Sequence, residues 1–383
     1  MANRKMYKFV DLFAGCGGLS LGLQQAGLTP WFVNEIVVQF CDTYKFNHNL
    51  SDEHYYVGDI AELNLHLNDY KEILSDITLV CGGPPCQGFS MANRQRILDD
   101  PRNNLYKQYL IFLQNVRPKF FIMENVKGMM NKIEEIKQNF ADYLGEEYHF
   151  DYSVLNAQDF GVPQNRERFI MIGNRVGVSP KDIFEEIYKH KRKPFLLKDA
   201  LEGLPHLAAK KEKGAKGIEC KESGFTECDF EYVQNDYYRF INGNKEIKKL
   251  YNHKNRYNND RDIEIYRRLP QGANSLHESI ADIMPYKRRN GIFKDKYFKL
   301  DENQVCKTIT SHMRFDCNMY IHPWEARGLS PREAARIQTF PDDYVITGSQ
   351  NMWYAQVGNA VPVKLAKAIG DGIMKFIRED MTL

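Results

Sequence analysis

The thiol of Cys86 lies in a turn where a reactive group is expected. Cys86 follows Gly83-Pro84-Pro85, just after the apolar run 77–81, which is typical of a short buried parallel strand. In open parallel sheets the chemistry takes place just beyond the carboxyl ends of the strands, and two consecutive prolines leave this turn little freedom. Cys86 is therefore a candidate nucleophile. The alternative is a proline turn that contains a small buried hydrophobic residue.

Three charged residues adjoin two other predicted strands. Glu124 ends the apolar run 120–123, at the same sheet edge as Cys86, and a carboxyl group there is suited to donate a proton. Taken alone, Glu124 would as readily be a helix cap or an ion-pair partner. Arg166 and Arg168 precede another strand, and alternation along an extended chain directs both to one side. Two guanidinium groups there could hold a carbonyl oxygen and lock the nucleophile loop, although such arginines more often lie on the surface.

A glycine-rich turn follows the first predicted strand. Residues 11–18, Asp-Leu-Phe-Ala-Gly-Cys-Gly-Gly, open a helix, where glycines let the backbone approach a ligand. Glu35 ends the second strand, from which a carboxylate can bind a ribose diol. Asp59 ends the third strand, where it suits an adenine amino group. Together these features predict an adenosine-containing cofactor.

The glycine pattern distinguishes between two such cofactors. The dinucleotide fingerprint has a third glycine where this chain has Ser20. Gly15-x-Gly17-Gly18, with Phe13 able to stack on a base, fits S-adenosylmethionine better than NAD.

Strands and helices alternate over the first 175 residues. We expect strands at 7–13, 30–34, 55–57, 77–81, 120–123, 152–155 and 169–172, and amphipathic helices at 19–26, 105–116 and 132–144. This alternation predicts an α/β fold with a doubly wound, mostly parallel, Rossmann-like sheet. Short helices are expected at 261–269 and, from a capping box that begins at Ser330, at 330–338. Residues 363–377 have apolar residues at helical spacing and are expected to return to the sheet.

Composition divides the chain into two parts. The 383 residues are 43% hydrophobic and 27% charged, as in a folded globular protein, and the length suggests two lobes. Residues 1–187 carry a net charge of −6, whereas residues 188–300 carry +9 and show no sustained period. A basic block beside an acidic one suggests a lobe that binds a polyanion, although a lysine-rich solvated surface would explain the charge equally well.

Several classes of protein are disfavoured. No apolar run approaches the ~18 residues of a membrane span, and residues 1–5 are polar, so we expect a cytoplasmic protein without membrane contact. The eight cysteines include no CxxC pair, so we expect reduced thiols and no metal site.

Six segments, in this order, resemble the motifs of bacterial DNA (cytosine-5)-methyltransferases of the restriction-modification type. They are residues 11–18, Gly83-Pro84-Pro85-Cys86-Gln87, Glu124-Asn125-Val126, 164–168, Arg332-Glu333-Ala334-Ala335-Arg336 and 356–362. Each match is modest, but the ordered set is specific and covers the chain from Phe9 to Gly370. The resemblance implies a catalytic S-adenosylmethionine-binding domain, 1–187 plus 350–383, and a smaller, irregular target-recognition domain, 188–349.

The resemblance also implies a role for each candidate residue. Cys86 would add as a thiolate to carbon 6 of a cytosine flipped out of duplex DNA, so that carbon 5 can accept a methyl group. Glu124 would contact ring nitrogen 3 and the exocyclic amine. Arg168 would hold the ring carbonyl, and Arg166 would support the Cys86 loop. The residues implied to line the cofactor pocket are Phe13, Cys16, Gly18, Glu35, Asp59, Ile60, Pro85, Leu105 and Asn359.

Three other functions remain open at this point. A related enzyme could act on tRNA cytosine, a homologue could bind DNA without catalysis, and a dinucleotide oxidoreductase could share the glycine-rich turn. A monomer is expected, as is a cognate restriction endonuclease that forms no stable complex with this chain. The target sequence cannot be read from these residues.

Overall fold

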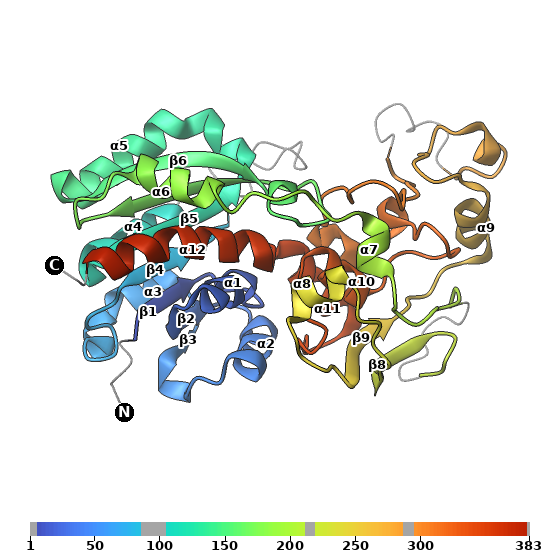
Figure 1. The fold of residues 1–383 in the computed structure, drawn as a ribbon, viewed down its shortest axis with the longest axis horizontal. Helices are drawn as coiled ribbons and strands as arrows, with labels where there is room; N and C mark the ends of the chain where they lie inside the picture. The colour runs from blue at the N-terminus through green and yellow to red at the C-terminus, as the bar shows by residue number, and fades with distance from the viewer. Residues whose placement is uncertain (1–5, 86–104, 211–218, 286–294, 381–383) are drawn as a thin grey trace. The chain divides into compact units, whose positions relative to one another are not determined.

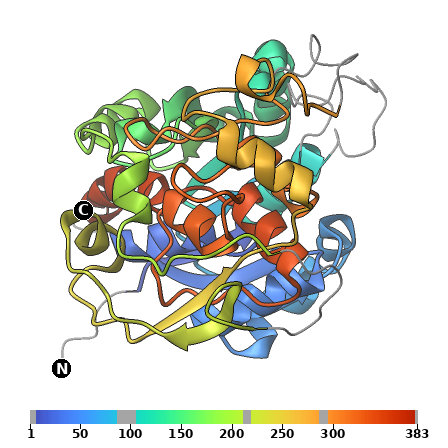
Figure 2. The same ribbon diagram turned by 90° about the vertical axis from the view of Figure 1, so that its right-hand side faces the viewer.

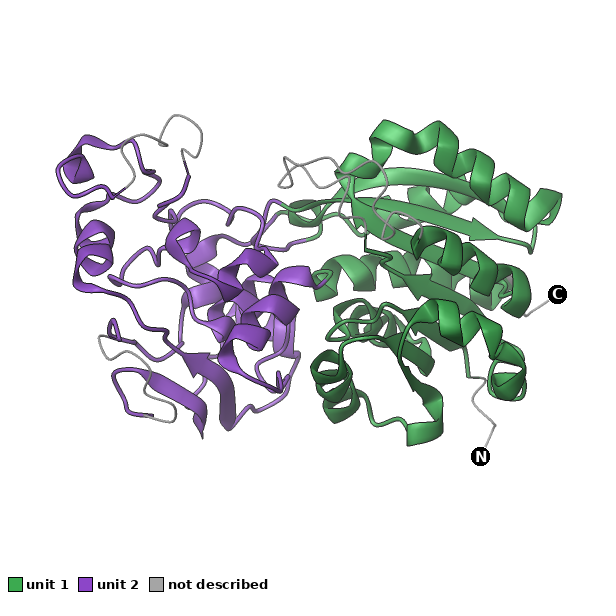
Figure 3. Ribbon diagram, turned by 180° about the vertical axis from the view of Figure 1, so that it is seen from behind, with its two compact units in different colours: residues 1–160, 166–193, 361–383 green, residues 161–165, 194–360 purple. Residues whose placement is uncertain are grey.

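The computed structural model describes residues 6–85, 105–210, 219–285 and 295–380. Two compact units are present (Figure 3): unit 1 comprises residues 1–160, 166–193 and 361–383, and unit 2 comprises residues 161–165 and 194–360. The sequence placed the domain boundaries at 187/188 and 349/350. In the structure, residues 350–360 lie in unit 2, whereas the resemblance assigns them to the catalytic domain.

Unit 1 is built on a seven-stranded sheet of order β3-β2-β1-β4-β5-β7-β6 (Figure 1). The strands are β1 (Lys8–Leu12), β2 (Thr29–Glu35), β3 (Tyr55–Val57), β4 (Leu79–Gly82), β5 (Phe120–Val126), β6 (His149–Asn156) and β7 (Glu167–Asn174). The first five strands run parallel, whereas β7 is antiparallel to both β5 and β6. The predicted doubly wound, mostly parallel sheet is confirmed, and each predicted strand overlaps an observed one.

Helices cover both faces of this sheet. They are α1 (Gly18–Ala26), α2 (Val38–His48), α3 (Ile60–Leu65), α4 (Leu105–Val116), α5 (Ile133–Leu144), α6 (Pro180–Tyr188) and α12 (Val363–Asp380). Apolar residues of α3, α4 and α5 pack with one face of the central strands in a single core. Helices α1 and α2 pack on β2, and α6 packs on β6 and β7. Both faces are thus buried, which explains the near-continuous apolar runs of β4 and β5.

The helix α12 packs along α1, as predicted for the last helix (Figure 1). Two glycines allow the close approach: a Cβ at Gly22 would lie 2.4 Å from the Ala366 Cβ, and one at Gly370 would lie 2.7 Å from the Ala26 Cβ. Unit 1 therefore closes only with residues from both ends of the chain. No helix in the described ranges has the length and hydrophobicity to cross a membrane.

Unit 2 contains short helices and a two-stranded sheet, with long irregular connections (Figures 1 and 2). Its helices are α7 (Leu197–Leu201), α8 (Asp236–Asn242), α9 (Asp260–Arg268), α10 (Pro331–Ile337) and α11 (Gln350–Asn359), and its antiparallel strands are β8 (Gly224–Asp229) and β9 (Lys249–Lys254). The capping box predicted at Ser330 is present, since Ser330 Oγ accepts from the Glu333 amide and Glu333 Oε2 accepts from the Ser330 amide.

Candidate active site

The ends of β4 and β5 bring two predicted site segments together. Gly82 pairs with Met123 in parallel register, so the residues that follow each strand lie at one edge of the sheet. A Cβ at Gly83 would lie 2.9 Å from Glu124 Oε2. The Asn125 side-chain amide donates to the Pro84 carbonyl oxygen at 2.8 Å. This contact fixes the turn that leads into the predicted nucleophile.

Glu124 and Arg168 form an ion pair at this edge. Arg168 Nε lies 2.8 Å from Glu124 Oε1, and the two side chains are only 11% and 12% exposed. Burial lowers the pKa of Arg168, and the adjacent Glu124 carboxylate opposes that effect. Because Arg168 pairs with Val126 in the β5–β7 register, its guanidinium reaches Glu124 diagonally on the same face.

Arg166 is buried at 1% exposure, just before β7. Its backbone amide donates to Asn156 Oδ1 at 3.1 Å, and its carbonyl accepts from the Ala157 amide. These contacts tie the segment before β7 to the end of β6. The burial of Arg166 excludes the alternative of a surface arginine, whereas its support of the Cys86 loop stays a prediction.

Cys86 lies outside the described residues, which end at Pro85 and resume at Leu105. Its role as nucleophile therefore remains a prediction. The described flanks are Pro85, which is exposed, and Leu105, the first residue of α4.

The glycine-rich turn adopts a ligand-accessible conformation between β1 and α1. Phe13 has φ +58°, and Gly15 and Gly17 have φ +56° and +81°. The Gly15 amide donates to Glu35 Oε2 at 2.7 Å, and the Val37 amide donates to Glu35 Oε1 at 2.8 Å. No atom of the described residues lies within 4 Å of a Cβ placed at Gly15, so the backbone is open to a ligand.

The chemistry of this turn suits an adenosine cofactor. Burial raises the pKa of Glu35, while backbone amides from Val37 and Gly15 lower it. A carboxylate has about four acceptor positions, so two amides leave Glu35 able to bind a diol. The predicted residues therefore fit the expected group.

The other residues that the resemblance implies for the cofactor pocket belong to both units, and their role stays a prediction. Asp59 is exposed and caps α3 by accepting from the Ala61 amide, whereas Ile60 is buried. Cys16 and Gly18 are buried beside the turn, and burial raises the pKa of Cys16 to about 12, so its thiol stays protonated. Asn359 is the exposed last residue of α11 in unit 2, and its place in the pocket remains a prediction.

The motif 332–336 forms the interior of unit 2. The Arg332 guanidinium is fully buried and donates to the carbonyl oxygens of Tyr251, Pro341 and Tyr344. Arg336 pairs with buried Asp342 at 2.7 Å. These charges are paired or hydrogen-bonded to backbone, so this motif stabilises unit 2 and offers no free chemical group.

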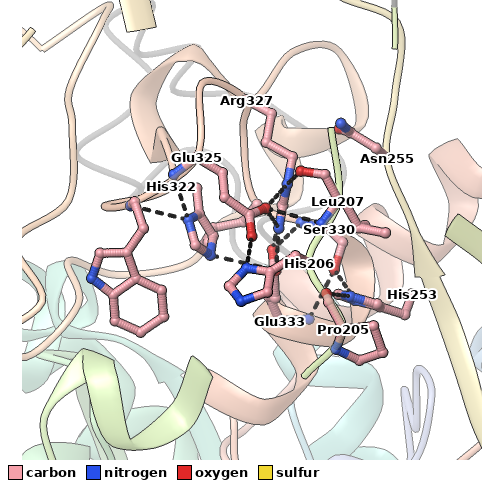
Figure 4. Close-up of polar contacts among 12 residues, drawn as sticks. Pro205, His206, Leu207, His253, Asn255, His322, Glu325, Arg327, Ser330 and Glu333 are labelled. Atoms are coloured by element: carbon pink, nitrogen blue, oxygen red, sulfur yellow. Dashed lines mark hydrogen bonds and ion pairs between the residues drawn. The ribbon is translucent and has the colours of Figure 1, made fainter. Parts of the chain in front are cut away.

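Glu333, in the same motif, belongs to a buried polar cluster (Figure 4). Its carboxylate accepts two bonds from the guanidinium of Arg327, at 2.8 and 2.6 Å. His322 Nδ1 accepts from the amides of Trp324 and Glu325, so its proton is on Nε2, 3.6 Å from Glu333. Burial lowers the pKa of His322 to about 3, which keeps the ring neutral.

Some contacts at the site were not anticipated from sequence. The hydrogen bond from Asn125 to Pro84 joins residues 41 positions apart. Gln164 donates to Gln338 at 2.8 Å and accepts from the Ile309 amide, and all three lie in unit 2. The sequence offers one signal for Asn125 and Gln164, which is that both stand in motif segments. Nothing near them in the sequence indicates which residues they contact.

Comparison with known proteins gives consistent matches along the chain. Residues 7–375 match the model of the C-5 cytosine-specific DNA methylase family. Similar curated proteins include the type II methyltransferases M.DdeI of Desulfomicrobium norvegicum and M1.HphI of Haemophilus parahaemolyticus. M.DdeI is 32% identical over 95% of this chain and 88% of its own length, and M1.HphI is 31% identical over 96% and 87%.

Solved structures share the fold. A crystal structure described as a DNA modification methyltransferase encoded within an E. coli prophage aligns with a TM-score of 0.76 at 25% identity, covering 98% of this chain and 100% of the other. The S. pombe Dnmt2 methyltransferase aligns with a TM-score of 0.56 at 15% identity, covering 98% and 100%, which shows a common fold alone.

The sheet edge formed by Glu124 and Arg168, the open glycine turn and these full-length matches agree with one another. The chain belongs to the C-5 cytosine-specific DNA methylases, which transfer a methyl group from S-adenosylmethionine to carbon 5 of cytosine in DNA.

Proposed function

We propose that this enzyme methylates one cytosine within a specific sequence of duplex DNA, through a covalent adduct with Cys86. The observation that carries the proposal is the Glu124–Arg168 pair, which lies beside the segment Gly83–Pro84 that leads into Cys86. An acid on β5 and a guanidinium on β7, at the sheet edge where the strand before Cys86 ends, are the groups that addition to a cytosine ring requires.

Each residue has a defined task in this proposal. The Cys86 thiolate would add to carbon 6, so that the electron pair of the 5,6 bond forms a 4,5 double bond and the 3,4 pair takes a proton from Glu124 at nitrogen 3; Glu124 would also contact the exocyclic amine. Arg168 binds the ring carbonyl oxygen and orients Glu124. S-adenosylmethionine, when bound, supplies the methyl group that carbon 5 accepts. Loss of the carbon 5 proton and of the Cys86 thiolate then restores the double bond.

The cofactor would bind at the open glycine turn of unit 1. Glu35 would hold the ribose, Asp59 the adenine amino group, and Phe13 would stack on the base. The remaining pocket residues would be Cys16, Gly18, Ile60, Pro85, Leu105 and Asn359. Support comes from the accessible backbone at Gly15 and from the Glu35 carboxylate beside it.

Unit 2 would read the DNA sequence. The block 188–300 has a net charge of +9, suited to the phosphate backbone, and the target base must leave the helix before it can react. The names of the curated relatives suggest a type II restriction-modification system, in which methylation protects host DNA from an endonuclease of the same specificity. We propose that the protein acts as a monomer in the cytoplasm, with no stable complex with that endonuclease.

A suicide substrate tests the mechanism. DNA with 5-fluorocytosine at the target should form a stable covalent complex with the wild-type enzyme in the presence of S-adenosylmethionine, because fluorine cannot leave carbon 5 as a proton does. Mapping 5-methylcytosine in cells that express the protein would first identify the target. A peptide map that places the adduct on a residue other than Cys86, or label transferred only to tRNA, would contradict the proposal.

A further inference from the structure

Three buried residues form a hydrogen-bonded chain behind the glycine-rich turn. Ser20 Oγ donates to Asp11 Oδ2 at 2.5 Å, and the Tyr44 hydroxyl donates to Ser20 Oγ at 2.7 Å. Each of the three is at most 1% exposed. They come from β1, α1 and α2, so this Asp11–Ser20–Tyr44 chain joins three elements of unit 1.

The Asp11–Ser20–Tyr44 hydrogen bonds join the two ends of the segment that contains the glycine-rich turn. Asp11 lies just before the turn and Ser20 just after it, so their bond ties the two ends of residues 11–20 together. Between them, Phe13 holds a left-handed conformation that non-glycine residues rarely adopt. Such a conformation persists only where the surrounding structure fixes it.

Two further hydrogen bonds tie this segment to β2. The Ala14 amide donates to the Asn34 carbonyl at 3.1 Å, and the Gly15 amide donates to Glu35. Both precede α1, and Gly17, the N-cap of α1, has no side chain to cap the helix. The Gly17 amide donates to the Ala14 carbonyl oxygen, and Ser20 adds the side-chain contact that ties the first turn of α1 to β1 and α2.

The hydroxyl of Ser20 donates a hydrogen bond to Asp11 and accepts one from Tyr44. A serine within a helix often donates to the carbonyl of the preceding turn, but this one donates to Asp11 instead. A glycine, which the dinucleotide fingerprint has here, would leave both Asp11 and Tyr44 without this partner. Burial of such polar groups is unfavourable unless they are hydrogen-bonded.

Asp11 also adjoins the strand that leads to the nucleophile. It pairs in register with Cys81 of β4, and the Cys81 thiol hydrogen-bonds to its carboxyl group. Burial raises the pKa of Asp11 to about 7, and the hydrogen bonds from Ser20 and Cys81 oppose that shift. The loss of Ser20 would thus disturb a group that already lacks solvent.

We propose that Ser20 is a positioning residue for the cofactor, which acts by holding the turn 13–17 between Asp11 and Tyr44 in the conformation that binds S-adenosylmethionine. This inference rests on the proposed cofactor site at that turn. It predicts a specific loss of cofactor affinity, whereas a purely structural role predicts a loss of stability alone.

The test compares three variants of the full chain. Ser20→Ala removes the central hydroxyl, and Tyr44→Phe removes one donor while keeping the ring. Tyr148→Phe is the matched control, because the Tyr148 hydroxyl is also buried in unit 1 and donates to a backbone carbonyl, that of Pro118, at 2.5 Å. Isothermal titration with S-adenosylhomocysteine, without DNA, gives the Kd, and initial rates give KM and kcat.

We expect Ser20→Ala to raise the Kd and the KM for the cofactor about tenfold, the effect of one lost hydrogen bond to a charged group. Tyr44→Phe should raise both about threefold, with the KM for DNA unchanged. Tyr148→Phe should lower the melting temperature and leave the cofactor Kd as in wild type.

Other outcomes would overturn the proposal in distinguishable ways. If Ser20→Ala and Tyr44→Phe lower the melting temperature as Tyr148→Phe does and leave the Kd unchanged, Ser20 is structural only. If Ser20→Ala does not fold, an unchanged Kd in Tyr44→Phe leads to the same conclusion. If wild type itself binds no S-adenosylhomocysteine, the cofactor site is wrong and the inference fails with it.

Discussion

The Arg168 guanidinium lies 2.8 Å from the Glu124 carboxylate, across two antiparallel strands and between residues that are not directly opposite. The pair is nearly buried, so each side chain orients the other at the sheet edge. An arginine in this place can bind an oxygen of the substrate with its remaining donors while Nε holds the carboxylate.

Glu124→Gln should reduce kcat by about 10²- to 10⁴-fold, the usual contribution of a positioned acid. The amide keeps the shape but cannot supply a proton, so binding of DNA and cofactor should change little. Single-turnover transfer of a labelled methyl group measures the effect. Glu147→Gln, which removes an exposed carboxylate that pairs with Arg117, should retain full activity, and equal rates for both variants would refute the role of Glu124.

Asn125→Ala should slow formation of the covalent complex with DNA that contains 5-fluorocytosine. The change releases the Pro84 carbonyl and with it the turn before Cys86, while the cofactor turn keeps its contacts. We expect at least about tenfold slower trapping, because near-attack geometry depends on that turn, and an unchanged Kd for S-adenosylhomocysteine. Trapping at the wild-type rate would mean that this hydrogen bond does not position the nucleophile.

Two buried histidines of unit 2, His253 and His322, should make stability depend on pH, because burial lowers the pKa of both. His322 is held neutral with a pKa of about 3, below the 6.5 of the unfolded chain. The unfolded state therefore binds an extra proton as pH falls below 6.5, and stability is lost from there toward pH 3 by about 1.4 kcal/mol per unit.

The variant His322→Asn tests this dependence, since its carbonyl oxygen can still accept from the backbone amides that His322 Nδ1 binds. Denaturant unfolding at pH 7.5 and at pH 5 should show the variant losing about 2 kcal/mol less than wild type over that interval. The same pH dependence in both proteins would mean that His322 is protonated in the folded state.

Glu333→Gln should destabilise the protein by about 3 kcal/mol, because it leaves the fully buried Arg327 without one of its two carboxylate partners. Glu264→Gln is the matched control in unit 2, since Glu264 pairs with Arg267 and Arg268 on the surface. An exposed pair contributes about 0–1 kcal/mol. Equal losses of stability for the two variants would show that the buried pair contributes no more to the free energy of unfolding than the exposed pair.

The sequence predicted the sheet well because its central strands, such as β4 and β5, are buried on both faces and form continuous apolar runs. The helix α2 and the antiparallel strands β8 and β9 were not predicted. Val38–His48 has polar residues on most sides, β8 is largely exposed, and β9 buries polar residues such as Asn252 and His253, so none of the three shows a clear hydrophobic period. Tertiary contacts, not local pattern, determine these elements.

For the site, the sequence predicted the motif residues but not how they are held. The sequence predicted Glu124 at the sheet edge of Cys86 and Arg168 before another strand, and the structure pairs the two side chains directly. The contacts of Asn125 with Pro84, and of Tyr44 with Ser20, join residues 41 and 24 positions apart. Secondary-structure propensity and hydrophobic period carry no information on contacts between residues so far apart in the sequence. The roles of these side chains can therefore be inferred only from the folded structure.

The packing of α12 on α1 has a consequence for folding during synthesis. Gly22 and Gly370 both lie at that interface, although nearly the whole chain separates them. During synthesis the glycine turn emerges from the ribosome long before α12, the helix that supports α1. A nascent chain should therefore be inert until residues 363–380 have also been made and can pack on α1.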